Sequence, residues 1–257
     1  MTAAETTALH TRMMKCALEV QEARAYWAQV DAGEDPKAEE AFERFWFGSR
    51  SLPRVRVLLA NLRARFSAFP DAQWVLHRWS DMEPEVRRLI THWHVQLSDP
   101  LYRRFTADYL VERRAHPTRS VSRDPVQRWV EGQGPTRWTT GTHRQFASKL
   151  LSTAYMAGFV GGRRDPRSVT LPRVDLHALE YLMYLLRGTA IEGRLVDNPY
   201  LRALELDAGA LRDRLRKSPA VQLRMAGGIE DVEWTYPNLR AWAVGRLGVA
   251  PGSEEMN

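Results

Sequence analysis

Residues 124–174 decide the fold of the second half of the chain and read DPVQRWVEGQGPTRWTTGTHRQFASKLLSTAYMAGFVGGRRDPRSVTLPRV. Asp124-Pro125 is expected to open a short helix, because proline fits the first turn of a helix. The glycines and proline of 132–135 predict a turn. The apolar residues that follow recur at steps of three and four, which predicts a longer helix over 142–157.

The longer helix is marked at both ends and is followed by a hairpin pattern. Thr139 or Thr140 is expected to cap its N-terminus, and Gly158 to end it. Phe159-Val160 and residues 168–174 then predict two short strands around a glycine-rich basic turn. Helix, turn, helix and a hairpin with a basic tip is the order of elements in a winged helix.

The first half of the chain predicts a succession of helices. Residues 5–30 contain no Gly or Pro and place apolar side chains at steps of three and four, which predicts one long amphipathic helix. Further helices are expected over 37–47, 51–69, 71–79, 81–97 and 99–116. The polar stretch 116–124 contains Pro, Ser and Arg. It is expected to separate an N-terminal helical domain, residues 1–118, from a C-terminal domain, residues 119–257.

Start signals are clear at several later helices. Asp99-Pro100 combines an N-cap acid with proline in the first turn. A helix is expected over 175–187, and Asn198 and Asp207 are each expected to open another one. These side chains accept hydrogen bonds from the first backbone N–H groups of a helix, which have no partner within it.

A second hairpin is expected near the C-terminus. Residues 221–225 and 232–236 flank a Gly-Gly pair, and proline at 237 is expected to start a final helix. Residues 198–236 therefore predict a second winged-helix-like unit. The fold class that follows is mainly α, with an N-terminal helical bundle followed by winged-helix-like units with short β-hairpin wings.

Composition excludes several classes of protein. The chain has 257 residues, a formal net charge of +6 and one cysteine, so it has no intrachain disulfide and no cysteine-based zinc cluster. No secretory signal is apparent, and the longest uncharged stretch, Leu150–Gly162, is too short to span a membrane. These features predict a soluble, cytoplasmic protein with no membrane partner.

Arginine supplies most of the positive charge. Only four of the 37 basic residues are lysines. Guanidinium groups pair bidentately with phosphate, so this bias favours a nucleic-acid partner. The alternative is that arginine replaces lysine in a GC-rich genome, and composition alone does not separate the two.

No catalytic pattern emerges from the sequence. There is no Gly-rich phosphate loop and no G-x-S-x-G motif. His92 and His94 point about 200° apart on a helix, so one is expected to be buried and the other at the surface. Cys16 is interpreted as a small core residue. We therefore expect no catalytic residue, no metal site and no cofactor.

Basic and hydroxyl side chains gather around the longer helix and the hairpin tip. Backbone N–H groups and the dipole at a helix N-terminus favour phosphate, so this region is the candidate DNA interface. A second basic cluster falls after Asp207 and is interpreted equally well as a solvated face. A third, made of Arg54, Arg56, Arg63 and Arg65, is expected on the exposed side of the helix over 51–69, opposite its apolar side. The candidate DNA-binding residues are Arg137, Thr140, Thr142, His143, Arg144, Lys149, Arg163, Arg164, Arg167, Arg212 and Arg216. The alternative is that a helix-turn-helix of this kind docks another protein.

Several stretches resemble the BrxA family of bacterial BREX phage-defence systems. They are Trp138–Phe159 followed by Leu171-Pro172, the closing Val232-Glu-Trp-Thr-Tyr-Pro-Asn-Leu239, and, more weakly, residues 49–66 and 99–105. The resemblance covers about residues 38–242, and its motifs are mostly core and helix-start positions.

The resemblance implies a small, mostly helical, non-enzymatic protein that binds double-stranded DNA. Its partners in the defence system would be a methyltransferase, an ATPase and a phosphatase-like protein. Two other functions stay open. One is an adaptor that holds these proteins together, and the other is a winged-helix transcriptional regulator, which normally needs a dimer.

Overall fold

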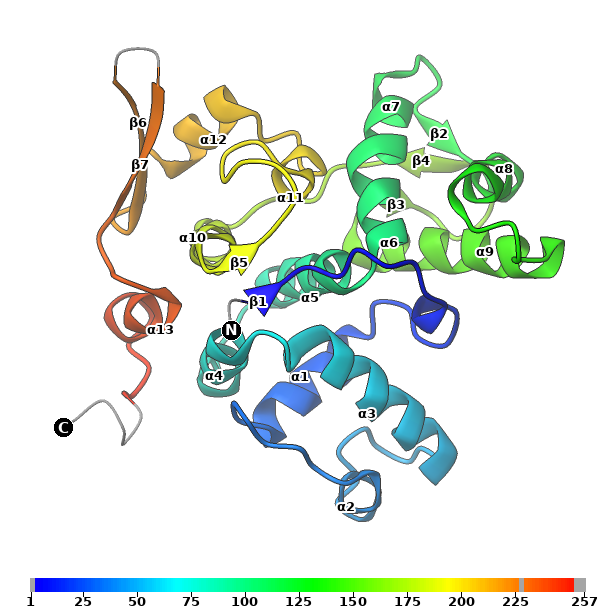
Figure 1. Ribbon diagram of the computed structural model, residues 1–257, viewed down its shortest axis with the longest axis horizontal. Coiled ribbons are helices and arrows are strands. Elements are labelled where there is room, and N and C mark those ends of the chain that lie inside the picture. The colour runs from blue at the N-terminus through cyan, green and yellow to red at the C-terminus, as the bar shows by residue number, and fades with distance from the viewer. Residues whose placement is uncertain (1–2, 227–228, 252–257) are drawn as a thin grey trace.

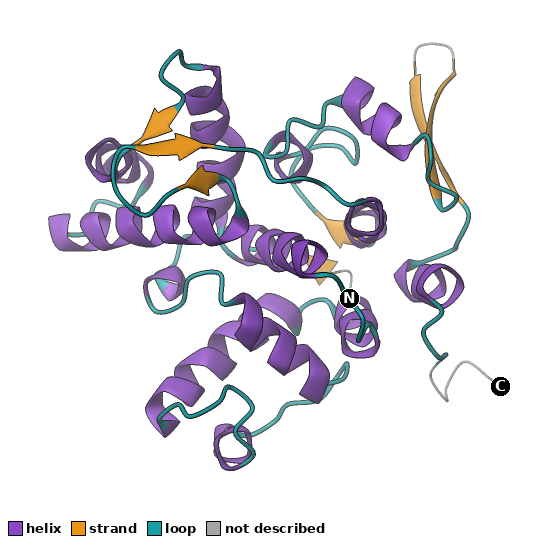
Figure 2. Ribbon diagram, turned by 180° about the vertical axis from the view of Figure 1, so that it is seen from behind, coloured by secondary structure: helices purple, strands orange, loops and turns teal. Residues whose placement is uncertain are grey.

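The computed structural model describes residues 3–226 and 229–251, and the protein is mainly helical with three small sheets (Figures 1 and 2). The turn at Gly227-Gly228 lies outside the described residues. The N-terminal half contains β1 (Ala3–Ala4), the 3-10 helix η1 (Arg12–Met14), α1 (Val20–Gln29), α2 (Ala38–Glu43), α3 (Leu52–Phe66), α4 (Pro70–Arg78), α5 (Pro84–Ser98), α6 (Pro100–Arg104), the π-helical η2 (Phe105–Tyr109) and α7 (Leu110–Ala115).

Helix α5 runs through the middle of the molecule. It packs against α1, α3, α9 (Thr140–Ala157) and α10 (Leu176–Arg187), and every residue from Leu89 to Ser98 is buried. The expectation that one of His92 and His94 reaches the surface is therefore wrong, because a helix covered on all sides has no solvent face. The His92 ring hydrogen-bonds Tyr102, and the His94 ring hydrogen-bonds Tyr181.

The N-terminal segment does not form the single helix expected over 5–30. Only residues 20–29 are α-helical, and Glu19 before them adopts φ 57°. Arg65 of α3 explains the break. It is buried rather than on the exposed arginine face expected for this helix, and its guanidinium donates to the carbonyls of Ala17 and Leu18, at 2.6 Å each. These carbonyls are used by a residue almost 50 positions away instead of by the next helical turn.

The second half begins with a three-stranded sheet and with two helices that lie between its first and second strands in the sequence. Its elements are β2 (Ser120–Val121), α8 (Arg123–Gln133), α9 (Thr140–Ala157), β3 (Val160–Gly161) and β4 (Arg167–Val169). The strands are antiparallel in the spatial order β2-β4-β3. Helix α7 packs against both β2 and β4, so it lies beside a sheet formed beyond residue 118. The domain boundary expected there stays a prediction.

The C-terminal elements follow as α10 (Leu176–Arg187), β5 (Thr189–Ala190), α11 (Pro199–Arg202), α12 (Ala208–Leu215), β6 (Val221–Ala226), β7 (Ile229–Trp234), α13 (Leu239–Trp242) and the π-helical η3 (Ala243–Leu247). The helix starts expected at Asn198 and Asp207 are confirmed, since their side chains accept backbone N–H groups of the helices they precede. Asp175 caps α10 in the same way. The second hairpin is present, with Val221 opposite Trp234. Among the described residues, no helix combines the length and apolar character that crossing a bilayer requires.

Candidate nucleic-acid interface

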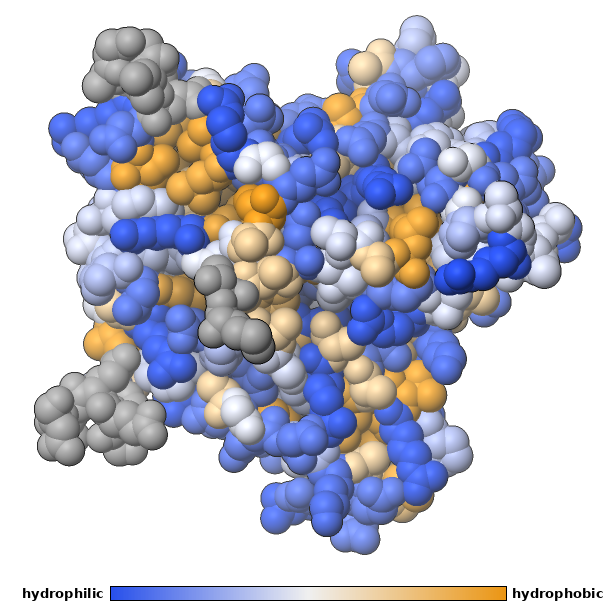
Figure 3. Space-filling model, viewed as in Figure 1, coloured by the Kyte–Doolittle hydropathy of each residue, from blue (hydrophilic) through white to orange (hydrophobic). Residues whose placement is uncertain are grey.

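Residues 119–174 carry all of the net positive charge of the chain. They hold ten of the 37 lysines and arginines but only three of the 31 acidic residues. This segment therefore has a net charge of +7, and the rest of the chain has a net charge of −1. Figure 3 shows hydrophilic residues over much of the side that α8 and α9 form. Charge of one sign on one unit attracts a polyanion.

The turn before α9 is fixed by aromatic packing. The Trp138 ring stacks on Phe146, with ring centroids 4.5 Å apart. A Cβ atom on Gly134 would lie 2.5 Å from the Trp138 ring, so only glycine fits this close approach. Thr139, one of the two caps expected, accepts the backbone N–H of Thr142 at 3.2 Å. The start of α9 is thereby held in one position relative to α8.

One side of α9 forms core and the other faces solvent. Phe146, Leu150 and Leu151 are buried, as the periodicity predicts. The exposed stripe contains Thr140, Gly141, Arg144, Gln145 and Ser148, and Lys149 beside it is half-buried. Within the described ranges 3–226 and 229–251, Arg144 and Lys149 form no ion pair, and neither does the exposed Arg137 at the turn. Their charges are available to an external anion.

His143 lies differently from the other candidate residues of α9. Its side chain is only 13% exposed, and Nδ1 lies 3.9 Å from a carboxylate oxygen of Glu131 on α8. The Trp138 ring lies on another side, with centroids 6.3 Å apart. The ring thus packs into the α8–α9 turn, and Thr142 next to it is half-buried.

The wing between β3 and β4 is tied to both helices. The Arg163 guanidinium lies 5.3 Å from the centre of the Tyr155 ring on α9, a cation–π distance. Asp165 accepts the backbone N–H of Arg123 at the start of α8 and the Nε–H of Arg167, both at 2.8 Å. Burial raises the pKa of Asp165, but these hydrogen bonds outweigh it and the pKa is lowered. Arg164 is exposed at the tip.

The arginines of α3 are much less available than those of α9. Arg54, Arg56 and Arg63 each form an ion pair with an acidic residue, at 2.9, 2.7 and 2.5 Å. Arg65 is buried. Since these charges are already neutralised within the protein, the α3 face is a weaker candidate for binding an anion than α9.

The basic cluster on α12 divides into two sides. Arg212 and Arg216, the pair singled out by sequence, are exposed. Arg214 and Lys217 instead line a cleft together with Arg173, which precedes α10. Arg214 and Lys217 belong to the cluster expected after Asp207, but their grouping with Arg173 was not predicted, because Arg173 is separated from α12 by more than 30 residues and has no local motif.

No group of three or more His, Cys, Asp or Glu side chains within 3–226 and 229–251 is arranged to hold a metal ion. His92 and His94 are both buried in the core.

Comparison with known proteins gives a fold relationship. No protein-family model matches the chain, and no curated protein matches it. The chain is similar to the crystal structure of an uncharacterized protein from Magnetospirillum magneticum, with a TM-score of 0.54 and 14% sequence identity. The similarity covers 71% of this chain and 98% of that chain. At this identity the similarity shows a shared fold alone.

Proposed function

We propose that this protein binds double-stranded DNA through α9 and the wing, as a non-enzymatic component of a BREX phage-defence system. The observation that carries DNA binding is the +7 charge of residues 119–174, most of it on exposed side chains of one compact unit. The place in phage defence rests on the resemblance to the BrxA family.

The arrangement of this unit supports the proposal. The two helices are followed by a hairpin, and the strand order β2-β4-β3 is compatible with a winged helix, which supports this part of the proposal. In a helix-turn-helix the second helix enters the major groove with its N-terminal residues toward the bases. In this protein that end carries Thr140 and Arg144 on the exposed side, with Lys149 one turn further. Arg163 and Arg164 on the wing then lie along the phosphate backbone, whereas Arg167 is already paired with Asp165 and contributes less.

The contacts we propose are mostly to phosphate, so the binding tolerates many sequences. Arginine and lysine side chains on an exposed helix neutralise the backbone without reading bases. His143 has a different role in this proposal, because its ring packs inside the α8–α9 turn and supports the helix start. Such binding weakens steeply as salt rises, because each neutralised phosphate releases counterions.

The double variant Arg144→Gln/Lys149→Gln tests the interface. Each lost phosphate contact lowers the steepness of log affinity against log salt by about 0.9. At roughly 0.15 M salt, this corresponds to an affinity about fivefold weaker than that of the wild type. We expect the pair to lose about thirtyfold, measured by fluorescence anisotropy on unrelated duplexes. The matched control is Lys15→Gln/Lys37→Gln, which removes two exposed charges from the N-terminal half and should change the slope little.

Other outcomes favour the alternative functions. Equal losses in both double variants would reduce the effect to net charge and contradict the proposed interface. A wild-type protein that binds no duplex at low salt would favour the adaptor, and a preference above about 10³-fold for one site would favour the regulator. The Arg144→Gln/Lys149→Gln variant can also be tested in a host with the full defence system. If it still protects against phage, DNA binding through α9 is not needed for the defence role.

A further inference from the structure

A cleft of about 420 Å³ opens between the start of α10 and α12. It lies beyond α8, α9 and the β3–β4 wing, which together are called the α8–α9 unit below. Its lining is Arg173, Val174, Asp175, Leu176 and Leu179 on one side and Asp213, Arg214 and Lys217 on the other. Three cations reach it from two elements, namely Arg173, Arg214 and Lys217, and all three are exposed.

The cleft also contains two carboxylates, but they leave the cations available. The Asp175 side chain accepts the N–H groups of His177 and Ala178 at 2.8 and 3.3 Å as the N-cap of α10. In the part of the chain that the structure describes, none of the three cations forms an ion pair, even with Asp213 nearby. Three unpaired cations converging on one hollow provide a surface for a polyanion rather than an internal salt bridge.

The cleft continues the basic surface of the α8–α9 unit. Arg173 lies four residues after β4, so its Cα is within about 14 Å of that of Val169 even if the chain is fully extended. Figures 1 and 2 show the segment after β4 crossing from the three-stranded sheet toward α10. Arg173 therefore stands between the wing and the two cations of α12. Helix α9, at 18 residues, is about 27 Å long, shorter than one turn of B-DNA.

We infer that the Arg173–Arg214–Lys217 cleft is a second contact for the backbone of the same DNA duplex that α9 and the wing engage. The inference rests on the proposed function and extends it. A duplex presents a phosphate about every 3.4 Å along each strand, so one long enough to pass the wing places phosphates over Arg173. The protein then has two anchoring points on one duplex, and its footprint exceeds the length that a single helix-turn-helix covers.

Helix α12 supplies its own control. Arg214 and Lys217 lie three positions apart and face the cleft, whereas Arg212 and Arg216 lie four apart on another side of the helix and do not line it. Replacing either pair with glutamine removes two exposed positive charges from residues 212–217, which span the end of α12 and the turn after it. A difference between the two variants therefore reports where the charges point and not how many there are.

The experiment measures duplex affinity against salt for the full-length variants Arg214→Gln/Lys217→Gln and Arg212→Gln/Arg216→Gln. With a duplex of about 30 base pairs, we expect the cleft pair to lower the salt slope by about 1.8, with a loss of about thirtyfold at roughly 0.15 M salt. The control pair should stay within about threefold of the wild type, because Arg212 and Arg216, although candidates from the sequence, lie outside both the cleft and the contacts proposed for α9 and the wing. With a duplex of about 10 base pairs, both variants should resemble the wild type, since a short duplex held by α9 ends before the cleft. Adding Arg173→Gln should lower the slope on the long duplex by about 0.9 more.

The possible results separate this inference from the proposed function. If the cleft pair behaves like the control pair on long duplexes while Arg144→Gln/Lys149→Gln still loses affinity, the cleft does not bind DNA and the α9 interface stands. A larger loss for Arg212→Gln/Arg216→Gln overturns the cleft assignment in favour of the other side of α12. If the wild type binds neither duplex, both the inference and the proposed function fail.

Discussion

At pH 5 this protein is expected to unfold far more readily than at pH 7. Burial lowers the pKa of both His92 and His94 to about 3, whereas a histidine in the unfolded chain has a pKa near 6.5. Between these values the unfolded chain binds two more protons than the native protein. The free energy of unfolding then falls by about 1.4 kcal/mol per pH unit for each histidine, or about 2.7 kcal/mol for both. Small proteins have only about 5–15 kcal/mol to lose.

The stabilisation is complete above about pH 6.5 and is lost as the pH falls toward the native pKa. Asp99 has the opposite effect on the free energy of unfolding at low pH. Burial raises its pKa, so protonation of Asp99 favours the folded state. The histidine contribution therefore shows most clearly between about pH 5 and pH 7.

Urea unfolding across that pH range measures the effect. His92→Gln and His94→Gln each remove one titrating ring. Each should therefore reduce the number of protons taken up on unfolding by about one, and with it the slope of the free energy of unfolding against pH, whatever the variant does to absolute stability. The exposed His116 supplies the control, since His116→Gln leaves both buried rings in place. A wild-type pH dependence in both core variants would refute the argument.

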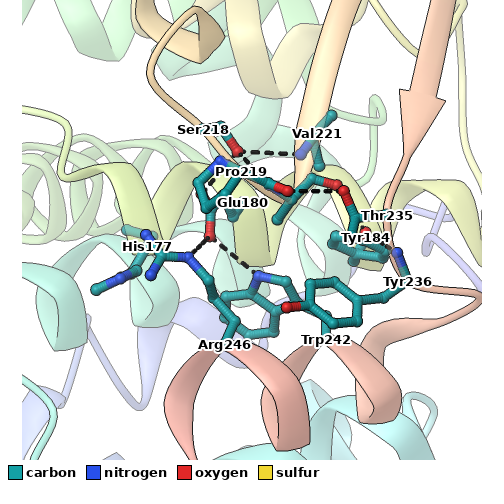
Figure 4. A network of polar contacts seen from close by, with 12 residues as sticks. His177, Glu180, Tyr184, Ser218, Pro219, Val221, Thr235, Tyr236, Trp242 and Arg246 are labelled. Carbon is teal, nitrogen blue, oxygen red and sulfur yellow. Dashed lines mark hydrogen bonds and ion pairs between the residues drawn. The ribbon is translucent and has the colours of Figure 1, made fainter.

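Replacing Glu180 with alanine is expected to cost about 3–5 kcal/mol, because it leaves buried partners without their acceptor. Glu180 on α10 is fully buried. Its carboxylate accepts from Ser218 at 2.7 Å and from Trp242 Nε1 and Arg246 Nε at 3.1 Å each (Figure 4). These three donors come from the segment before β6, from α13 and from η3, so one carboxylate joins three C-terminal elements to α10.

The free energy of urea unfolding provides the measurement, and two variants sharpen it. Asp108→Ala removes a carboxylate whose ion pair with Arg202 is about half exposed on both sides, so it should cost no more than about 1 kcal/mol. Glu180→Leu/Arg246→Met removes both charges and should recover the part of the loss that comes from the unpaired Arg246, while Ser218 and Trp242 still lack their acceptor. Similar values for Glu180→Ala and Asp108→Ala would show that the buried contacts contribute no more than surface ones.

The candidate interface was predictable to the extent that it is local. Thr139, Arg144 and Lys149 fall within three turns of one helix, and the periodicity that buries Phe146 also fixes which side remains exposed. The outward orientation of Arg144 therefore follows from spacing alone. The inward packing of His143 does not follow from spacing, because it depends on Trp138 and on Glu131 of the neighbouring helix.

The cleft beside α12 was beyond the reach of sequence reasoning. Arg214 and Lys217 lie among Arg212 and Arg216 over the end of α12 and the turn after it, and the two pairs differ in the direction they face. Which direction meets Arg173 depends on how α12 packs relative to the segment before α10. That packing is set by the core between elements far apart in the chain, so spacing within α12 carries no signal of it.

The sequence by itself determined the mainly helical fold, the positions of most helices and the caps at Asp99, Asn198 and Asp207. Each cap is a hydrogen bond between groups two or three residues apart, so the residues within one helical turn are enough to predict it. Only the tertiary structure decided the path of the N-terminal segment, since its carbonyls at positions 17 and 18 are taken by Arg65 from α3. Only the tertiary structure, likewise, buried both faces of α5. A helix pattern shows which side is apolar, but burial of the polar side requires partners such as Tyr102 and Tyr181 to meet the two histidines.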